Sequence, residues 1–141
     1  MNSALYNEDI KALARARIGA GRLDSPTAQG FADNPFCGDR IELDIEVTDG
    51  RITALAHRTR GCLLCEAAAS AMAQAALGAT PAEALAIGEN LDALMRGDEA
   101  PPSLARFAPV AAHRNRHECV TLPFRALTIA VRSAARDHLE P

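Results

Sequence analysis

The segment RIELDIEVTDGRITALAHRT, residues 40–59, decides the fold expected for this chain. From Arg40 to Val47 it alternates between apolar and charged residues, which is typical of a β-strand with one buried and one solvated face. Asp49-Gly50 follows, and glycine accepts the positive φ that tight hairpin turns require. The residues from Ile52 to Thr59 are then expected to return as a second strand. The segment therefore predicts an antiparallel β-hairpin.

Helical patterns surround this hairpin. Three kinds of signal place the expected helices: apolar residues at helical spacing, glycines after the last turn, and the helix start Thr80-Pro81-Ala82-Glu83. A third strand is not obvious, because residues 22–33 are small, polar and turn-rich and can supply at most a short one. Helices are expected over residues 3–17, 62–77, 81–87, 89–96 and 121–138, with Pro123 tolerated in the first turn of the last one.

Length and composition limit the classes of protein to consider. The 141 residues fit one domain, residues 1–141, and an apolar content of 48% suffices for one hydrophobic core. A net charge of −3 argues against a nucleic-acid-binding module, which usually carries a basic face. No apolar run approaches the ~18 residues that span a bilayer, and the first residues do not read as a secretory signal. We therefore expect a cytoplasmic protein with neither a membrane nor a nucleic-acid partner.

Four cysteines, Cys37, Cys62, Cys65 and Cys119, are the main chemical signal. Thiols stay reduced in the cytosol, so four of them there point to metal or sulfur chemistry more often than to disulfides. Cys37 lies on a turn and is followed two residues later by Asp39. Cys62 and Cys119 are each expected near a helix N-terminus, whose partial positive charge favours a thiolate.

Three thiolates with one carboxylate or imidazole make a four-coordinate site suited to zinc or to an iron–sulfur cluster. The thiols would come from Cys37, Cys62 and Cys119, and the other donor from Asp39 or His117. Intervals of 25 and 57 residues separate these cysteines, unlike the paired Cys-x-x-Cys knuckles of zinc ribbons. They fit a site assembled from distant loops at one end of a domain.

Other interpretations of these residues stay open. Cys62-Leu63-Leu64-Cys65 has the spacing of a redox pair, although the alternating strand–helix order of thioredoxin-like proteins is absent. Cys65 alternatively is an auxiliary thiol or simply a small buried residue of an alanine-rich helix. His117 is an auxiliary ligand or a histidine near the site by chance. His57 is interpreted as an ordinary sheet residue.

The cysteines lie in three longer segments with recognisable patterns. These are Asn34-Pro35-Phe36-Cys37-Gly38-Asp39-Arg40-Ile41, Gly61-Cys62 with Glu66 to Met72 behind it, and Arg116-His117-Glu118-Cys119-Val120-Thr121-Leu122-Pro123-Phe124-Arg125-Ala126-Leu127. They resemble a known family, the iron–sulfur cluster assembly scaffolds of the IscU/SufU/NifU N-terminal type. The resemblance covers about residues 5–135, and the long stretch before the third cysteine is similar to the SufU branch. It differs at Cys65, which is extra, and at Glu118, where IscU-type members have histidine.

The resemblance implies an α+β fold, in which a small antiparallel sheet packs against several helices and the site is exposed at one end. It implies that Cys37, Asp39, Cys62 and Cys119 bind zinc or hold a transient [2Fe–2S] cluster. It also implies that Cys37 or Cys119 accepts persulfide sulfur from a cysteine desulfurase of the SufS or IscS type. Cluster carriers or apo-proteins would be the downstream partners.

The leading hypothesis is therefore a scaffold or sulfur-transfer protein rather than an enzyme in its own right. A protein with a purely structural zinc ion is the second hypothesis. A thiol oxidoreductase that uses Cys62 and Cys65 is the third.

Overall fold

The computed structural model describes residues 5–139 and contains the expected hairpin. Strands β2 (Asp39–Thr48) and β3 (Arg51–Arg60) pair antiparallel, with Ile41 opposite Thr59. Asp49 and Gly50 both have positive φ at the turn, as a tight hairpin requires. The apolar side of the alternation, including Ile41, Leu43 and Ile45, is fully buried. The structure therefore confirms both strands and the buried apolar face. The expected solvated face is wrong at Asp44, which is 1% exposed because the segment that contains Leu23 covers it.

A third strand, β1 (Ala28–Asn34), pairs antiparallel with β2 and gives the sheet order β1-β2-β3. Residues 22–33 were expected to form a loop or to supply a short third strand. The strand is confirmed, with seven residues that extend to Asn34, and the loop interpretation was wrong from Ala28 onward. The buried positions of β1 are Ala28, Gly30 and Ala32, which are poor strand formers in isolation. They are small because helix α4 (His117–Leu139) comes very close: a Cβ at Gly30 would collide with the carbonyl oxygen of Ala126.

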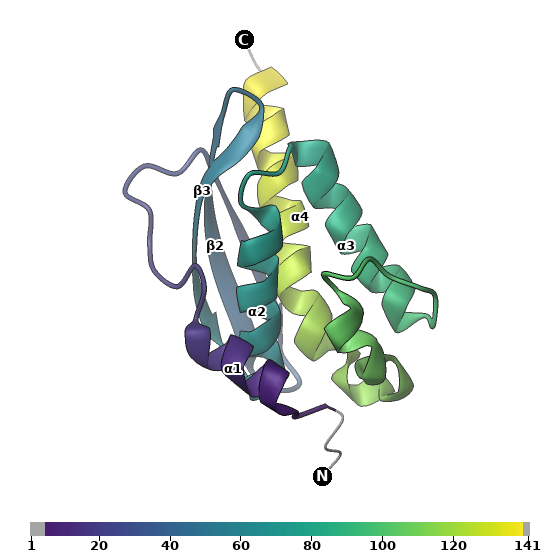
Figure 1. Cartoon of the computed structure of the whole chain (residues 1–141). Coiled ribbons are helices and arrows are strands. Elements are labelled where there is room, and N and C mark those ends of the chain that lie inside the picture. Colours follow the sequence, from purple (N-terminus) through teal and green to yellow (C-terminus); the bar gives the residue numbers. More distant parts are fainter. Residues whose placement is uncertain (1–4, 140–141) are drawn as a thin grey trace.

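The sheet carries helices on one side. Helix α4 packs against β1 and β2, α2 packs against α4 and β3, α3 packs on α4, and α1 packs on α2 (Figure 1). The core lies between these helices and the apolar face of the sheet. The helices are α1 (Glu8–Ala16), α2 (Leu63–Ala76), α3 (Pro81–Met95) and α4 (His117–Leu139), with the 3-10 helices η1 (Ala105–Ala112) and η2 (Arg114–Arg116) before α4.

Two helix boundaries differ from the expectation. Helix α1 begins at Glu8 instead of residue 3, because the Asn7 side chain accepts a hydrogen bond from the Ile10 N–H at 2.9 Å and caps it; residues 3 and 4 lie outside the described residues. Helix α4 begins at His117, four residues before the expected start. Pro123 therefore lies beyond the first turn and cannot donate a hydrogen bond to the Cys119 carbonyl.

The two short helices expected over residues 81–87 and 89–96 are one helix, α3. Its start is as expected, with Thr80 as cap, Pro81 in the first turn and a reciprocal capping box with Glu83. Gly88, which suggested a break, is buried inside the helix instead. A Cβ there would come within 3.1 Å of the Thr128 hydroxyl of α4, so the glycine permits close helix packing.

The segment between α1 and β1 covers part of the other face of the sheet (Figure 1). At the edge of β3, Gly21 donates its N–H to the His57 carbonyl. His57 is buried, and its Nε2 lies 2.8 Å from the Ile18 carbonyl oxygen, which agrees with an ordinary sheet residue. Among residues 5–139, none of the helices is long and apolar enough to cross a membrane.

Candidate metal centre

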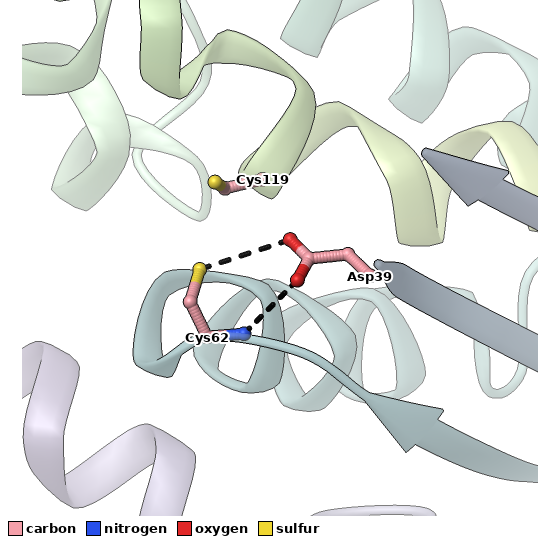
Figure 2. A group of neighbouring side chains, drawn as sticks. All are labelled: Asp39, Cys62 and Cys119. Carbon is pink, nitrogen blue, oxygen red and sulfur yellow. Dashed lines mark hydrogen bonds between the residues drawn. The ribbon is translucent and has the colours of Figure 1, made fainter. Parts of the chain in front are cut away.

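Three ligand-bearing side chains meet at one end of the sheet. A carboxylate oxygen of Asp39 and the sulfurs of Cys62 and Cys119 all lie within 4.8 Å of one another. Figure 2 shows the three side chains pointing toward a common point from β2, the start of α2 and the start of α4. Positions far apart in the sequence therefore converge.

Asp39 is fixed from the sheet side. It is the first residue of β2, and only 5% of its surface is exposed. Its Oδ1 accepts a hydrogen bond from the Cys62 N–H at 3.3 Å, and its Oδ2 lies 3.8 Å from the Cys62 sulfur (Figure 2). The carboxylate thus orients the backbone that carries the first thiol.

Cys62 is the N-cap residue of α2 and has the more acidic of the two site thiols. Its pKa is lowered to about 6, chiefly because the Cys119 thiol can donate its S–H to the Cys62 thiolate. Burial and the Asp39 charge act in the opposite direction, whereas the N–H groups of Cys65 and Leu64 in the first turn of α2 favour the thiolate. The thiolate is the form of cysteine that acts as a nucleophile and that binds a metal ion, so the lowered pKa makes Cys62 a candidate for both roles.

Cys119, in the first turn of α4, behaves in the opposite way. Its pKa is raised because it serves as donor to the Cys62 thiolate and because it is buried. Arg116, one turn earlier, interacts with this sulfur and offsets part of the rise. The pair therefore holds one proton at neutral pH, and a bound cation would release it.

This donor set fits a zinc ion. Ligands around a tetrahedral zinc with bonds of about 2–2.3 Å lie roughly 3–4 Å apart, and the Cys62 sulfur and Asp39 Oδ2 are 3.8 Å apart. Two sulfurs and one carboxylate leave one position for a further donor. The centre can therefore take a thiophilic divalent ion without closing around it.

Gly61 also belongs to the site. The sequence indicated only that this glycine ends a strand and did not reveal its role at the site. A Cβ at this position would lie 2.9 Å from the Cys65 sulfur and 3.0 Å from Asp39 Oδ1. The contact with the sulfur is closer than real Cβ atoms essentially ever show, and the contact with the carboxylate is tighter than most of their contacts. The glycine therefore lets the end of β3 pass between Asp39 and α2, which brings Cys62 to the carboxylate. The sequence signal that could have pointed to this role is the position of the glycine directly before Cys62, a candidate ligand.

Cys37 is placed differently from the other predicted ligands. It lies on an exposed turn in which the Gly38 N–H donates to the Asn34 carbonyl at 2.8 Å, and Gly38 has a φ of +79°. The thiol is exposed and is not among the three converging donors. Only Gly38 separates it from Asp39, so it borders the site.

The two auxiliary candidates also lie outside the cluster of three. Cys65 is fully buried, and burial together with the nearby negative charges of Asp39 and Cys62 raises the pKa of its thiol. The His117 Nε2 lies 2.9 Å from the Ala111 carbonyl oxygen and so binds the preceding segment. Their roles as ligands stay predictions.

Comparison with known proteins identifies the family. The family model described as the NifU-like N terminal domain matches residues 6–131. The chain is 34% identical over 125 residues to the iron–sulfur cluster assembly scaffold protein IscU of Streptococcus pyogenes serotype M1, covering 84% of this chain and 78% of the relative. It is 30% identical over 100 residues to the zinc-dependent sulfurtransferase SufU of Bacillus subtilis, covering 67% and 68%.

A solved structure agrees with this relationship. The N-terminal NifU-like protein of Brucella abortus superimposes with a TM-score of 0.90 at 27% identity, covering 95% of this chain and 96% of that one. The chain therefore has the architecture of the iron–sulfur scaffold class: a small antiparallel sheet packed against helices, with an Asp/Cys/Cys cluster at one end. The chain belongs to the NifU-like N-terminal domain family, as the resemblance of its three segments predicted. Relatives of both the IscU and the SufU kind match, so the branch is not decided by the comparison.

Proposed function

We propose that this protein is an iron–sulfur cluster assembly scaffold that accepts persulfide sulfur from a cysteine desulfurase. The observation that carries the proposal is the convergence of Asp39, Cys62 and Cys119 beside an exposed thiol, Cys37. The relatives named as scaffolds and as a zinc-dependent sulfurtransferase support it. Cluster carriers or apo-proteins would receive the product.

Cys37 is the proposed sulfur acceptor. Its thiol is exposed, whereas Cys119 is only 5% exposed, and a sulfur donor on another protein must reach the accepting atom. In the transfer, the Cys37 thiolate attacks the terminal sulfur of the desulfurase persulfide. The S–S bond of that persulfide breaks, and the desulfurase cysteine leaves as a thiolate. The terminal sulfur is then held on Cys37 with no net change of oxidation state.

Zinc is the proposed ion, held by Asp39, Cys62 and Cys119 with Cys37 as the fourth ligand. When bound, it would keep the thiols deprotonated at neutral pH and hold them in place. A carboxylate is a weaker ligand than a thiolate for a soft ion, so Asp39 keeps the site exchangeable. A nascent [2Fe–2S] cluster on the same donors would be the cargo of a scaffold.

Desulfurase turnover with and without this protein tests the proposal directly. We expect stimulation by the wild type, and a persulfide on Cys37 that mass spectrometry detects after limited reaction. Cys37→Ser should lose both, whereas Cys65→Ala, which alters a buried thiol outside the cluster, should keep them. No stimulation and no labelled cysteine would reject the sulfur-relay function. Label on Cys119 alone would move the acceptor role to that residue.

The metal is tested by elemental analysis with a UV–visible spectrum of freshly isolated protein. About one zinc per chain without charge-transfer absorption supports the zinc site, and absorption of a bound cluster supports the alternative cargo. The reduction potential of the Cys62–Cys65 pair tests the oxidoreductase hypothesis. Since Cys65 is fully buried and burial raises its pKa, we expect no disulfide at accessible potentials.

A further inference from the structure

The outer face of the sheet is covered only in part. The segment between α1 and β1 crosses from the edge of β3 to β1, where the Thr27 N–H donates to the Ile45 carbonyl. On the way, the Leu23 N–H donates to Asp44 at 3.1 Å. The half of this face toward Asp39, at the start of β2, lies beyond the crossing segment and stays open.

Two adjoining depressions of about 410 and 480 Å³ occupy this open half. The charged side chains that line them are Arg17, Arg40, Arg58, Arg60 and Glu42. Four positive charges against one negative charge stand out on a chain whose net charge is −3. We call the surface formed by the four arginines the arginine groove.

Half of the arginines in this groove have no acidic partner among residues 5–139, and the other two share Glu42 and Asp44. Arg58 is paired with Asp44, to which it donates hydrogen bonds of 2.9 and 3.1 Å. Arg40 has only a 3.7 Å contact with Glu42 and lies over the Phe31 ring at 5.4 Å. Arg17 and Arg60 form no ion pair within the part of the chain that the structure describes.

The register adds an energetic argument. Arg40 and Arg60 are directly opposite each other on β2 and β3, and like charges in that position destabilise a sheet. Asp33 is opposite Arg40 on the other side but makes no ion pair with it among the described residues. Carboxylates from outside would relieve this repulsion.

The groove lies next to the proposed sulfur site. Arg40 directly follows Asp39, and Arg60 precedes Cys62 by two residues. A protein that delivers sulfur to this end of the molecule therefore meets the groove as well. Phe31 is 46% exposed beside Arg40, and arginines with aromatic rings are enriched among the residues that dominate protein interfaces. A long polyanion such as nucleic acid is disfavoured by the overall negative charge.

We infer that the arginine groove binds an acidic segment of the cysteine desulfurase and so positions that protein over the thiols. This inference rests on the proposed function. Charge pairs at the edge of an interface act mainly on association rate and on salt dependence.

The test is the Kd of the organism's own cysteine desulfurase for three forms of this protein, measured by calorimetry. Arg40→Glu/Arg60→Glu reverses the opposed pair of the groove, and Arg132→Glu/Arg136→Glu reverses two exposed arginines of α4 as a matched control. We expect the groove variant to bind about 10-fold more weakly or worse, and the control within about 2-fold of wild type. Raising salt from about 50 to about 300 mM should weaken the wild type more than the groove variant. Circular dichroism checks that both variants stay folded.

The outcomes separate this inference from the proposed function. If the desulfurase does not bind the wild type, the proposed function fails. If it binds the wild type and the groove variant equally, the function stands and the arginine groove is not the docking surface. Sedimentation that shows a wild-type dimer, lost in the groove variant with desulfurase binding intact, would assign the groove to a second copy of this chain and overturn the inference.

Discussion

At the scale of single residues, the site depends on two thiols with opposite acid–base behaviour. Cys62 has a pKa of about 6, and Cys119 donates to it and is harder to ionise. Since the thiolate is the reactive form, alkylation of Cys62 in metal-free protein should accelerate as pH rises through about 6 and level off above pH 7. Cys119→Ala removes the donor and should shift the midpoint upward by one unit or more. Mass spectrometry after timed iodoacetamide pulses measures the rate at each pH.

Cys65 is the internal control for this experiment. Being fully buried, with a raised pKa, it should remain unmodified while the protein is folded and react only in denaturant. A Cys62 midpoint at the ordinary value of a free thiol, in both wild type and Cys119→Ala, would contradict the electrostatic account of the pair.

Gly61 allows a second prediction about single residues. Gly61→Ala places a Cβ against the Cys65 sulfur and Asp39 Oδ1, so Asp39 or the start of α2 must move. We expect zinc affinity to fall by about 10–100-fold, as for other residues that position metal ligands. Competition with a chromophoric chelator measures it. The double variant Gly61→Ala/Cys65→Ala removes the Cys65 sulfur, one of the three atoms that the new Cβ would approach, and should recover part of the loss. An unchanged affinity in Gly61→Ala would show that the close approach is dispensable.

The sequence predicted the members of the centre better than it predicted their arrangement. Asp39, Cys62 and Cys119 stood out because thiols beside turn residues and a carboxylate are ligand types, and the structure brings these three together. The role of Gly61 was hidden because it depends on a contact with Asp39 across 22 residues of chain. The ligand roles of Cys37 and His117 stay predictions.

At the scale of secondary-structure elements, a buried charge pair ties the crossing segment to the sheet. Asp44 on β2 is 1% exposed and accepts hydrogen bonds from Arg58, Gln29 and the Leu23 N–H. Burial alone would raise its pKa, but these donors outweigh burial and lower the pKa to about 2. A carboxylate that is more acidic in the folded chain stabilises it above pH 4 and loses this contribution as pH falls toward 2.

Asp44→Asn should therefore lower the free energy of unfolding at pH 7 by about 2 kcal/mol and flatten its decrease between pH 5 and pH 2. Urea titrations at a series of pH values measure both effects. Asp92→Asn, at an exposed position of α3, serves as control and should change stability by less than about 0.5 kcal/mol. Equal pH profiles for wild type and Asp44→Asn would mean that the carboxyl does not carry this linkage.

The elements themselves were predictable where a local pattern determines them. Residues 40–59 form the expected hairpin because alternation and a glycine turn are local signals. β1 was only one of two alternatives for residues 22–33, because its inward residues are small where α4 approaches closely. α3 was divided in two at Gly88 for a similar reason. Close helix packing, which only the tertiary structure reveals, removed the local evidence in both cases.

At the scale of the whole molecule, the metal centre lies at the border of the core. Apolar side chains from the helices and the sheet form one buried cluster, to which Cys119 belongs and against which Cys62 packs. The large side chains of this core, such as Phe107, Phe124 and Leu43, are buried among other apolar residues. Stability and metal binding should therefore be coupled only by mass action.

Metal removal tests this mass-action coupling and the structural-zinc hypothesis together. Protein stripped with a chelator should keep its far-UV circular dichroism and unfold cooperatively, with Tm lowered by about 10–15 °C, because a ligand at about 1,000 times its Kd adds about 4 kcal/mol. Restoring zinc should restore the Tm of the wild type but not that of Asp39→Asn, which keeps an acceptor for the Cys62 N–H and loses the charged ligand. If the stripped chain instead loses its cooperative transition, the zinc ion is needed for folding, and the centre is a closed structural site rather than one that exchanges its ligands during sulfur transfer.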